Sequence, residues 1–150
     1  IKFKTFNMLG LPTETEKEMW ETVDINIKMK TDFPRASIFT PYPGTEIVEI
    51  AKKRGYLNKN FNFDNLPDTI LDRTILKKLN APRVQNMLFF FQTAVMFPSV
   101  HPIIKHLMSW KPNIIFRLYF YILYGCINGI AEKRNIFHYL PYLFANRRYR

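Results

Sequence analysis

Two short stretches decide how this chain folds: residues 6–15, FNMLGLPTET, and residues 38–45, IFTPYPGT. Each has an extended apolar run, then a tight turn containing glycine and proline, and then residues that begin a helix. Two consecutive strand–turn–helix units of this kind are the building block of parallel α/β folds, which bind ligands where strands pass into helices. The two turns are therefore the candidate functional region of the chain.

The first unit predicts a strand over Lys2–Leu9, followed by a turn and a helix. Pro12 keeps the residue before it out of the helical conformation, so the chain must turn before the helix begins. Either Thr13 or Thr15, each with the glutamate three positions later, fits a capping box at the start of that helix.

The second unit predicts a strand over Ala36–Thr40, a turn at 41–44 and a helix from about Thr45 to Arg54.

 
Gly55 follows that second helix, where a left-handed residue commonly ends a helix. A strand-to-strand connection that contains a helix matches a right-handed parallel crossover, so the strand ending at Leu9 and the strand over Ala36–Thr40 are predicted to be parallel neighbours.

The rest of the chain is predicted to be helical. Residues 58–69 are polar and rich in asparagine, and we interpret them as a linker between residues 1–57 and a helical accessory domain at 70–150. Proline near the first helical position marks several of the helix starts. The predicted helices are Leu71–Leu79, Pro82–Phe97, Ser99–Ser109, Pro112–Ala131 and Ile136–Phe144.

The positive charge of the chain is concentrated in this helical part. Residues 1–57 carry 9 Lys+Arg against 8 Asp+Glu, whereas residues 58–150 carry 13 against 4, so the second part holds +9 of the net charge of +10. Such a field favours anionic partners, namely nucleic acid, acidic lipid or a phosphorylated substrate, without choosing among them.

The helical part contains few signals of chemistry. The single cysteine, Cys126, excludes an internal disulfide and a metal site built from thiolates of this chain alone. His101 and His106 are five positions apart and do not share a helix face well, so no metal pair is predicted. The run Phe89–Phe91 is interpreted as core, with a wall of a substrate site as the alternative.

The apolar segment Ile114–Ala131 leaves three interpretations open. Its length approaches that of a membrane span, but Arg117 is costly in hydrocarbon. It can therefore be a spanning helix, a helix lying in a membrane interface, or a buried helix of the accessory domain, which we favour. The arginines at 147, 148 and 150 suit acidic lipid or a solvated tail, and we favour the tail.

Residues 8–15, MLGLPTET, and 40–45, TPYPGT, together resemble the last two strand–helix units of radical S-adenosylmethionine enzymes. The resemblance is to the branch with a cobalamin-binding domain, which includes the anaerobic magnesium-protoporphyrin ester cyclase. That family has LGLPGET and TPYPGT at these places, followed by a helix that ends in glycine, an aromatic residue and leucine, as at 55–57 here. The resemblance covers about residues 1–57, and Thr13 departs from it where the family has glycine.

The resemblance implies a fold class of α/β followed by all-α. Residues 1–57 would be the last two βα units of an incomplete (β/α)6 TIM-like barrel, and a helical C-terminal domain would follow. The chain opens inside a strand-like run without an initiating methionine, so we interpret it as a fragment.

The resemblance also implies cofactors. They are S-adenosylmethionine, a 4Fe-4S cluster held by a C-x3-C-x2-C loop that this stretch lacks, and cobalamin as an open alternative. Carried over position by position, the adenosine part of S-adenosylmethionine would lie near six residues: Met8, Leu9, Gly10, Thr40, Pro41 and Tyr42. Glu14 matches the glutamate of the family, with helix capping as its simplest role.

The function implied is reductive cleavage of S-adenosylmethionine to a 5′-deoxyadenosyl radical that starts methylation, cyclisation or rearrangement of a small or lipid-like substrate. The stretch itself is expected to be inactive, and the enzyme is expected in the cytoplasm, with membrane association left open. An alternative from another class is a basic helical module on an anionic membrane surface. RNA modification ranks last, because no separate RNA-binding barrel follows the linker.

Overall fold

The computed structural model describes residues 1–66, 70–71 and 74–132. Internal contacts divide the chain into a compact unit of residues 1–112 and a second unit, residues 113–150, whose described part is essentially one helix. The α-helices and strands in chain order are β1 (Lys4–Leu9), α1 (Glu16–Lys28), β2 (Phe33–Ile38), α2 (Glu46–Lys53), α3 (Ala81–Met96), α4 (His101–Met108) and α5 (Ile114–Glu132). Short 3-10 helices lie at Phe63–Asn65 and Pro98–Val100.

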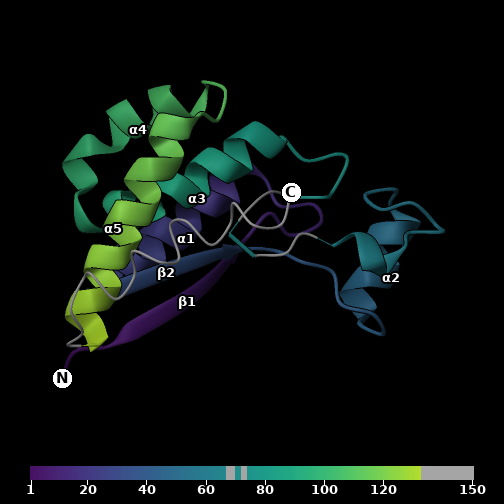
Figure 1. Ribbon diagram of the computed structural model, residues 1–150, viewed down its shortest axis with the longest axis horizontal. Helices are drawn as coiled ribbons and strands as arrows, with labels where there is room; N and C mark the ends of the chain where they lie inside the picture. Colours follow the sequence, from purple (N-terminus) through teal and green to yellow (C-terminus); the bar gives the residue numbers. More distant parts are fainter. Residues whose placement is uncertain (67–69, 72–73, 133–150) are drawn as a thin grey trace. The chain divides into compact units, whose positions relative to one another are not determined.

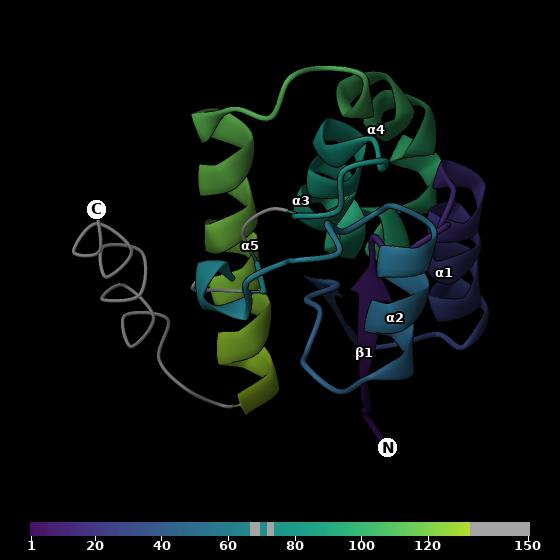
Figure 2. The same cartoon turned by 90° about the vertical axis from the view of Figure 1, so that its right-hand side faces the viewer.

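The two strands form a small parallel sheet with one covered face. Leu9 of β1 lies opposite Ile38 of β2, and both side chains are buried on the face over which α1 and α3 pack (Figures 1 and 2). Side chains alternate between the faces of a strand. Phe6 and Met8 therefore lie on the opposite face, where they are 76% and 48% exposed.

A buried polar cluster joins α1 to β1 on the covered face. The Asn26 side chain is fully buried and donates through Nδ2 to the Asn7 side-chain oxygen at 2.8 Å. Its own Oδ1 accepts from the Thr5 hydroxyl at 2.6 Å. Because buried polar groups must find partners, this cluster fixes how α1 lies along the strand.

Helix α3 supplies most of the core of the 1–112 unit. Its N-cap is Asn80, whose side-chain oxygen accepts a hydrogen bond from the backbone N–H of Arg83. Phe89, Phe90 and Phe91 are all at least 94% buried, which confirms their interpretation as core. The run 87–91 places apolar side chains on all sides of α3, and a helix segment of that kind is expected to be enclosed by its neighbours.

The predicted fold class is wrong. The described residues form a small α/β protein with two parallel strands and five α-helices, and a portion of a (β/α)6 barrel is not present. The strand–turn–helix repeat correctly indicates that two parallel strands are neighbours, but it does not set the number of strands. α3 packs on β2 within the 1–112 unit, so residues on both sides of the predicted 58–69 linker share one core.

Several element boundaries also differ from the prediction. β2 starts at Phe33, three residues before the predicted start, and therefore includes Pro34. Proline has no N–H to donate but is tolerated in an edge strand. Residues 74–80 form turns and irregular structure instead of the predicted helix Leu71–Leu79. The predicted helix Ile136–Phe144 lies outside the described residues.

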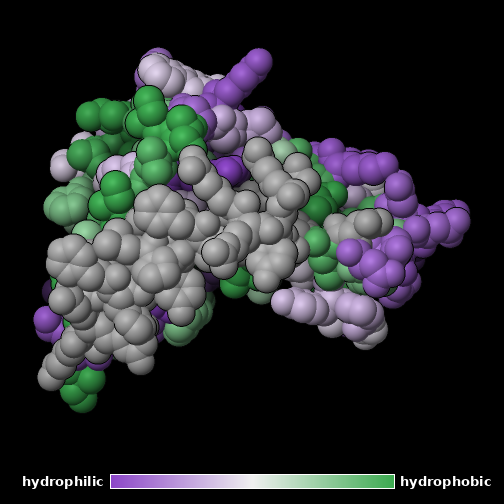
Figure 3. Space-filling model, viewed as in Figure 1, coloured by the Kyte–Doolittle hydropathy of each residue, from purple (hydrophilic) through white to green (hydrophobic). Residues whose placement is uncertain are grey.

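Helix α2 belongs to a small apolar cluster of its own. Buried Phe39, Val48, Ala51, Leu57 and Leu76 form this cluster. Gly55 has φ +73°, the left-handed conformation expected where α2 ends, and its N–H donates to the Lys52 carbonyl at 3.1 Å. Hydrophilic residues gather on the outside of this region (Figure 3).

Candidate functional site

The structure brings the two glycine–proline turns together at one edge of the sheet. β1 and β2 are parallel neighbours, so the turn after Leu9 and the turn after Ile38 leave the sheet at the same end. A hydrogen bond from the Phe39 N–H to the Leu9 carbonyl, at 2.8 Å, continues the pairing one residue beyond β2. The carboxyl end of adjacent parallel strands is where α/β folds bind ligands, so this edge is the candidate site.

The two turns share one backbone feature, a proline followed by a residue with positive φ. In the first, Pro12 is followed by Thr13 with φ +78°, and the Glu14 N–H donates to the Leu11 carbonyl at 3.0 Å. This is the pattern of a type II turn, whose third residue needs a left-handed conformation. In the second turn, a proline precedes Gly44, which has φ +79°. Thr13 therefore occupies the position that glycine fills in the second turn.

Replacing Thr13 with glycine is expected to raise the free energy of unfolding by about 1 kcal/mol, because a β-branched residue is strained at positive φ. Urea unfolding measures the effect. Lys30, with φ +55°, is unbranched and serves as the control, for which glycine should give a smaller gain. A lower stability of Thr13→Gly would contradict the turn geometry.

The Glu14 side chain folds back onto the backbone of the first turn. Its carboxylate accepts hydrogen bonds from the backbone N–H groups of Gly10 and Leu11, the second at 3.2 Å. It does not cap α1, because Thr15 and Glu18 form the reciprocal capping box there. Burial raises the pKa of the Glu14 carboxyl above its ordinary value of 4.5, although the two N–H donors oppose the shift.

This raised pKa of Glu14 predicts a pH dependence of stability. The folded state holds the proton more tightly than the unfolded chain, so the contribution of Glu14 to stability is fully present below pH 4.5 and is lost as pH rises through the raised pKa. Relative to Glu14→Gln, the wild-type chain should therefore lose stability as pH rises from about 4.5 towards neutrality. Urea unfolding of both proteins over this range measures their difference in stability. If the wild-type chain gained stability relative to Glu14→Gln as pH rises, the raised pKa of Glu14 would be contradicted.

Gly10 lies against the start of α3. A Cβ added at Gly10 would come 2.9 Å from Val84 Cγ1 and 3.7 Å from Leu79 Cδ1. Gly10 also has φ +76°, so both its backbone conformation and its surroundings favour glycine. Gly10 was predicted to lie near the adenosine, whereas the space where its Cβ would be is bordered by side chains of the chain itself.

The six residues assigned to the adenosine part of the cofactor differ in accessibility. Leu9, Gly10 and Pro41 are buried, and the Gly10 N–H is already bonded to Glu14. Thr40 is half-buried, and Met8 and Tyr42 are exposed. Of the six residues, Met8, Thr40 and Tyr42 are therefore the ones whose side chains are accessible to a ligand at this edge.

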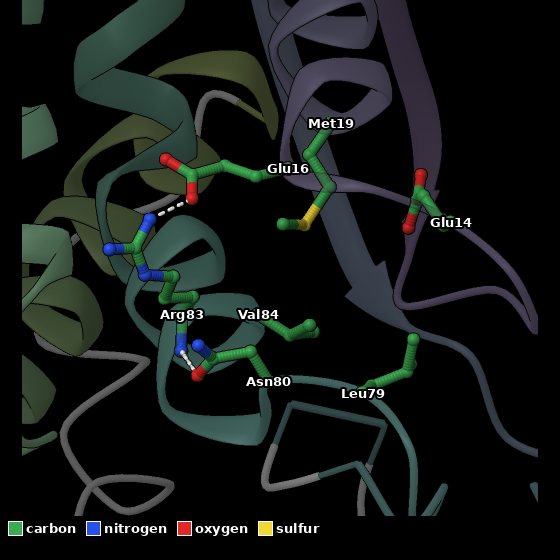
Figure 4. Close-up of a pocket in the computed structure, with 7 residues that line it drawn as sticks. All are labelled: Glu14, Glu16, Met19, Leu79, Asn80, Arg83 and Val84. Atoms are coloured by element: carbon green, nitrogen blue, oxygen red, sulfur yellow. Dashed lines mark hydrogen bonds and ion pairs between the residues drawn. The ribbon is translucent and has the colours of Figure 1, made fainter.

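A hollow of about 220 Å³ lies behind the first turn, on the side of α3 (Figure 4). Arg83 of α3 pairs with Glu16 of α1 across it, and the Met19 and Val84 side chains form its apolar wall. Sequence reasoning missed Glu16 and Arg83 as partners, because no spacing pattern connects residues so far apart in the chain. Across the described residues, no group of three or more His, Cys, Asp or Glu side chains is placed to hold a metal ion.

The described residues therefore form a small α/β protein. Its candidate site is the edge of the sheet where two parallel strands end in turns that contain glycine and proline. No protein-family model, curated protein or solved structure matches the chain.

Proposed function

We propose that this chain is the C-terminal part of a radical S-adenosylmethionine enzyme of the cobalamin-binding branch, acting on a small or lipid-like substrate. The observation that supports the proposal is that both motif turns follow neighbouring parallel strands and leave the sheet at the same end. A flat nucleoside held at such an edge would meet residues from both motifs.

The side chains available at this edge suit adenosine. Tyr42, 59% exposed, offers a ring that can stack on a purine, and Met8 offers a polarisable thioether. The Thr40 hydroxyl, 3.5 Å from the Ile38 carbonyl, can turn towards a ribose or purine nitrogen. Gly10 and Glu14 act indirectly in this proposal, because they hold the first turn in shape.

The proposal requires cluster ligands elsewhere in the full-length protein, because this chain has one cysteine. Such a cluster, when bound and reduced, would supply the electron needed to divide S-adenosylmethionine into methionine and the 5′-deoxyadenosyl radical. The part of the residues described here is to bind and orient the adenosine end of the cofactor.

The test uses the full-length protein, reconstituted without oxygen with iron and sulfide. It is expected to convert S-adenosylmethionine into methionine and 5′-deoxyadenosine, measured by chromatography. Tyr42→Ala should weaken S-adenosylmethionine binding by about tenfold, as loss of one stacking platform does. Phe97→Ala removes a ring that is 53% exposed at the end of α3 and should leave binding unchanged.

Two results would contradict the proposal. One is a complete reading frame without a C-x3-C-x2-C sequence. The other is equal binding of S-adenosylmethionine by wild type, Tyr42→Ala and Phe97→Ala, which would remove the edge from the cofactor site.

A further inference from the structure

We propose that α5 lies in the interface of an anionic membrane, parallel to its surface, with one apolar face towards the lipid. This inference is independent of the proposed cofactor site. Three observations carry it: the exposed side chains of α5, the stripe on which its polar residues fall, and the charge around it.

The exposed apolar side chains of α5 share a face. Ile114, Leu118 and Ile122 recur at intervals of four residues and are 64%, 51% and 58% exposed. Ile115, 71% exposed, lies beside them. Residues three and four apart are neighbours on a helix surface, so these side chains form a continuous apolar stripe. Figure 3 shows hydrophobic residues gathered over the amino-terminal part of α5.

The polar residues of α5 fall on a different stripe. Arg117, Tyr121 and Tyr124, which are exposed or half-buried, recur at intervals of four and three residues, and Asn128 on the same stripe is buried. At 100° per residue this stripe is centred well away from the one that contains Ile115 and Leu118. A helix with separate apolar and polar faces suits an interface, where one face meets hydrocarbon and the other meets water and headgroups.

Length and composition alone would also allow a span. Among the described helices, α5 contains a segment, Ile114–Ala131, that is long and apolar enough to cross a membrane, with a mean hydropathy of 1.5. Spanning would put the exposed Arg117 into hydrocarbon, whereas an interfacial position leaves its guanidinium in the polar layer. The separation of the faces therefore favours the interface.

Charge selects an anionic lipid surface as the partner. Residues 111–150 contain seven Lys+Arg and one acidic residue, Glu132. Basic residues beside an interfacial helix are attracted to acidic headgroups within a Debye length of the surface. Tyrosine, which α5 contains three times, is enriched at the same depth.

The first experiment is sedimentation of the full 150-residue chain with vesicles of phosphatidylcholine, with or without phosphatidylserine. Binding is expected to be at least tenfold stronger with phosphatidylserine at low salt, and to weaken as salt is added. The variant Ile115→Glu with Leu118→Glu should lose at least tenfold in binding. Ile103→Glu alters a side chain of α4 that is 60% exposed and should bind like wild type.

The second experiment needs no change in the apolar stripe. Cys126 is the only cysteine and lies eleven residues after Ile115, on the same side of α5, where it is partly exposed. An environment-sensitive fluorophore on Cys126 is expected to shift to the blue with anionic vesicles and to be quenched by lipids that carry a quencher near the headgroup.

Three results would overturn the proposal. One is no partitioning at low salt, and another is equal binding by the Ile115→Glu/Leu118→Glu variant. The third is preferential quenching by lipids labelled at the bilayer centre, which would indicate a spanning helix.

Discussion

Replacing Gly10 with alanine is expected to lower the free energy of unfolding by about 2–5 kcal/mol, one of the two largest effects predicted for this chain. Two costs combine. Alanine is strained at φ +76° by about 1–2 kcal/mol. The new Cβ would also come 2.9 Å from Val84 Cγ1, and crowding of a packed core costs about 1–3 kcal/mol.

Gly44→Ala is the matched control for Gly10→Ala. Gly44 has nearly the same φ, +79°, but no atom lies within 4 Å of an added Cβ. Urea unfolding of the two variants separates the cost of conformation from the cost of crowding. Val84→Ala introduced together with Gly10→Ala should return part of the loss, because the two positions are in contact. Equal effects of Gly10→Ala and Gly44→Ala would mean that the first turn does not pack on α3.

Replacing Asn26 with leucine is expected to destabilise the chain by about 3 kcal/mol. Leucine has a similar size but offers no partner to the Thr5 hydroxyl, which donates to Asn26 at 2.6 Å. The Asn7 side-chain oxygen also loses its donor at 2.8 Å. A buried polar group without a partner costs about 1–3 kcal/mol, and here more than one is left.

The control for Asn26→Leu is Asp24→Ala on the exposed side of α1, which should change the unfolding free energy by less than about 0.5 kcal/mol. Chemical denaturation followed by circular dichroism measures both variants. An Asn26→Leu chain as stable as wild type would show that the polar cluster does not fix α1 on β1.

Local structure could be predicted from the sequence wherever a short stretch contains its own cause. Thr15 and Glu18 form a capping box because their spacing alone satisfies two N–H groups. Gly55 ends α2 because few other residues adopt its conformation readily. The parallel pairing of β1 and β2 followed from the length of the connection between them and the helix inside it.

The candidate edge could be predicted only in part. Met8 and Tyr42 are exposed there as a ligand site needs, but the pattern could not show that Leu9 and Pro41 would be buried. It placed Gly10 near the adenosine, whereas the Gly10 N–H donates to Glu14 of the chain itself. A glycine in a turn indicates a close approach without indicating what approaches.

The sequence by itself determined the two turns, the helix ends and the neighbouring parallel strands, because each depends on residues a few positions apart or on one connection. Only the tertiary structure decided that α3 covers the sheet, that Val84 fills the space beside Gly10, and that Arg83 meets Glu16. These contacts join residues more than 40 positions apart, and periodicity contains no information on which distant face an apolar helix will meet. The same limit explains why the number of strands was predicted wrongly.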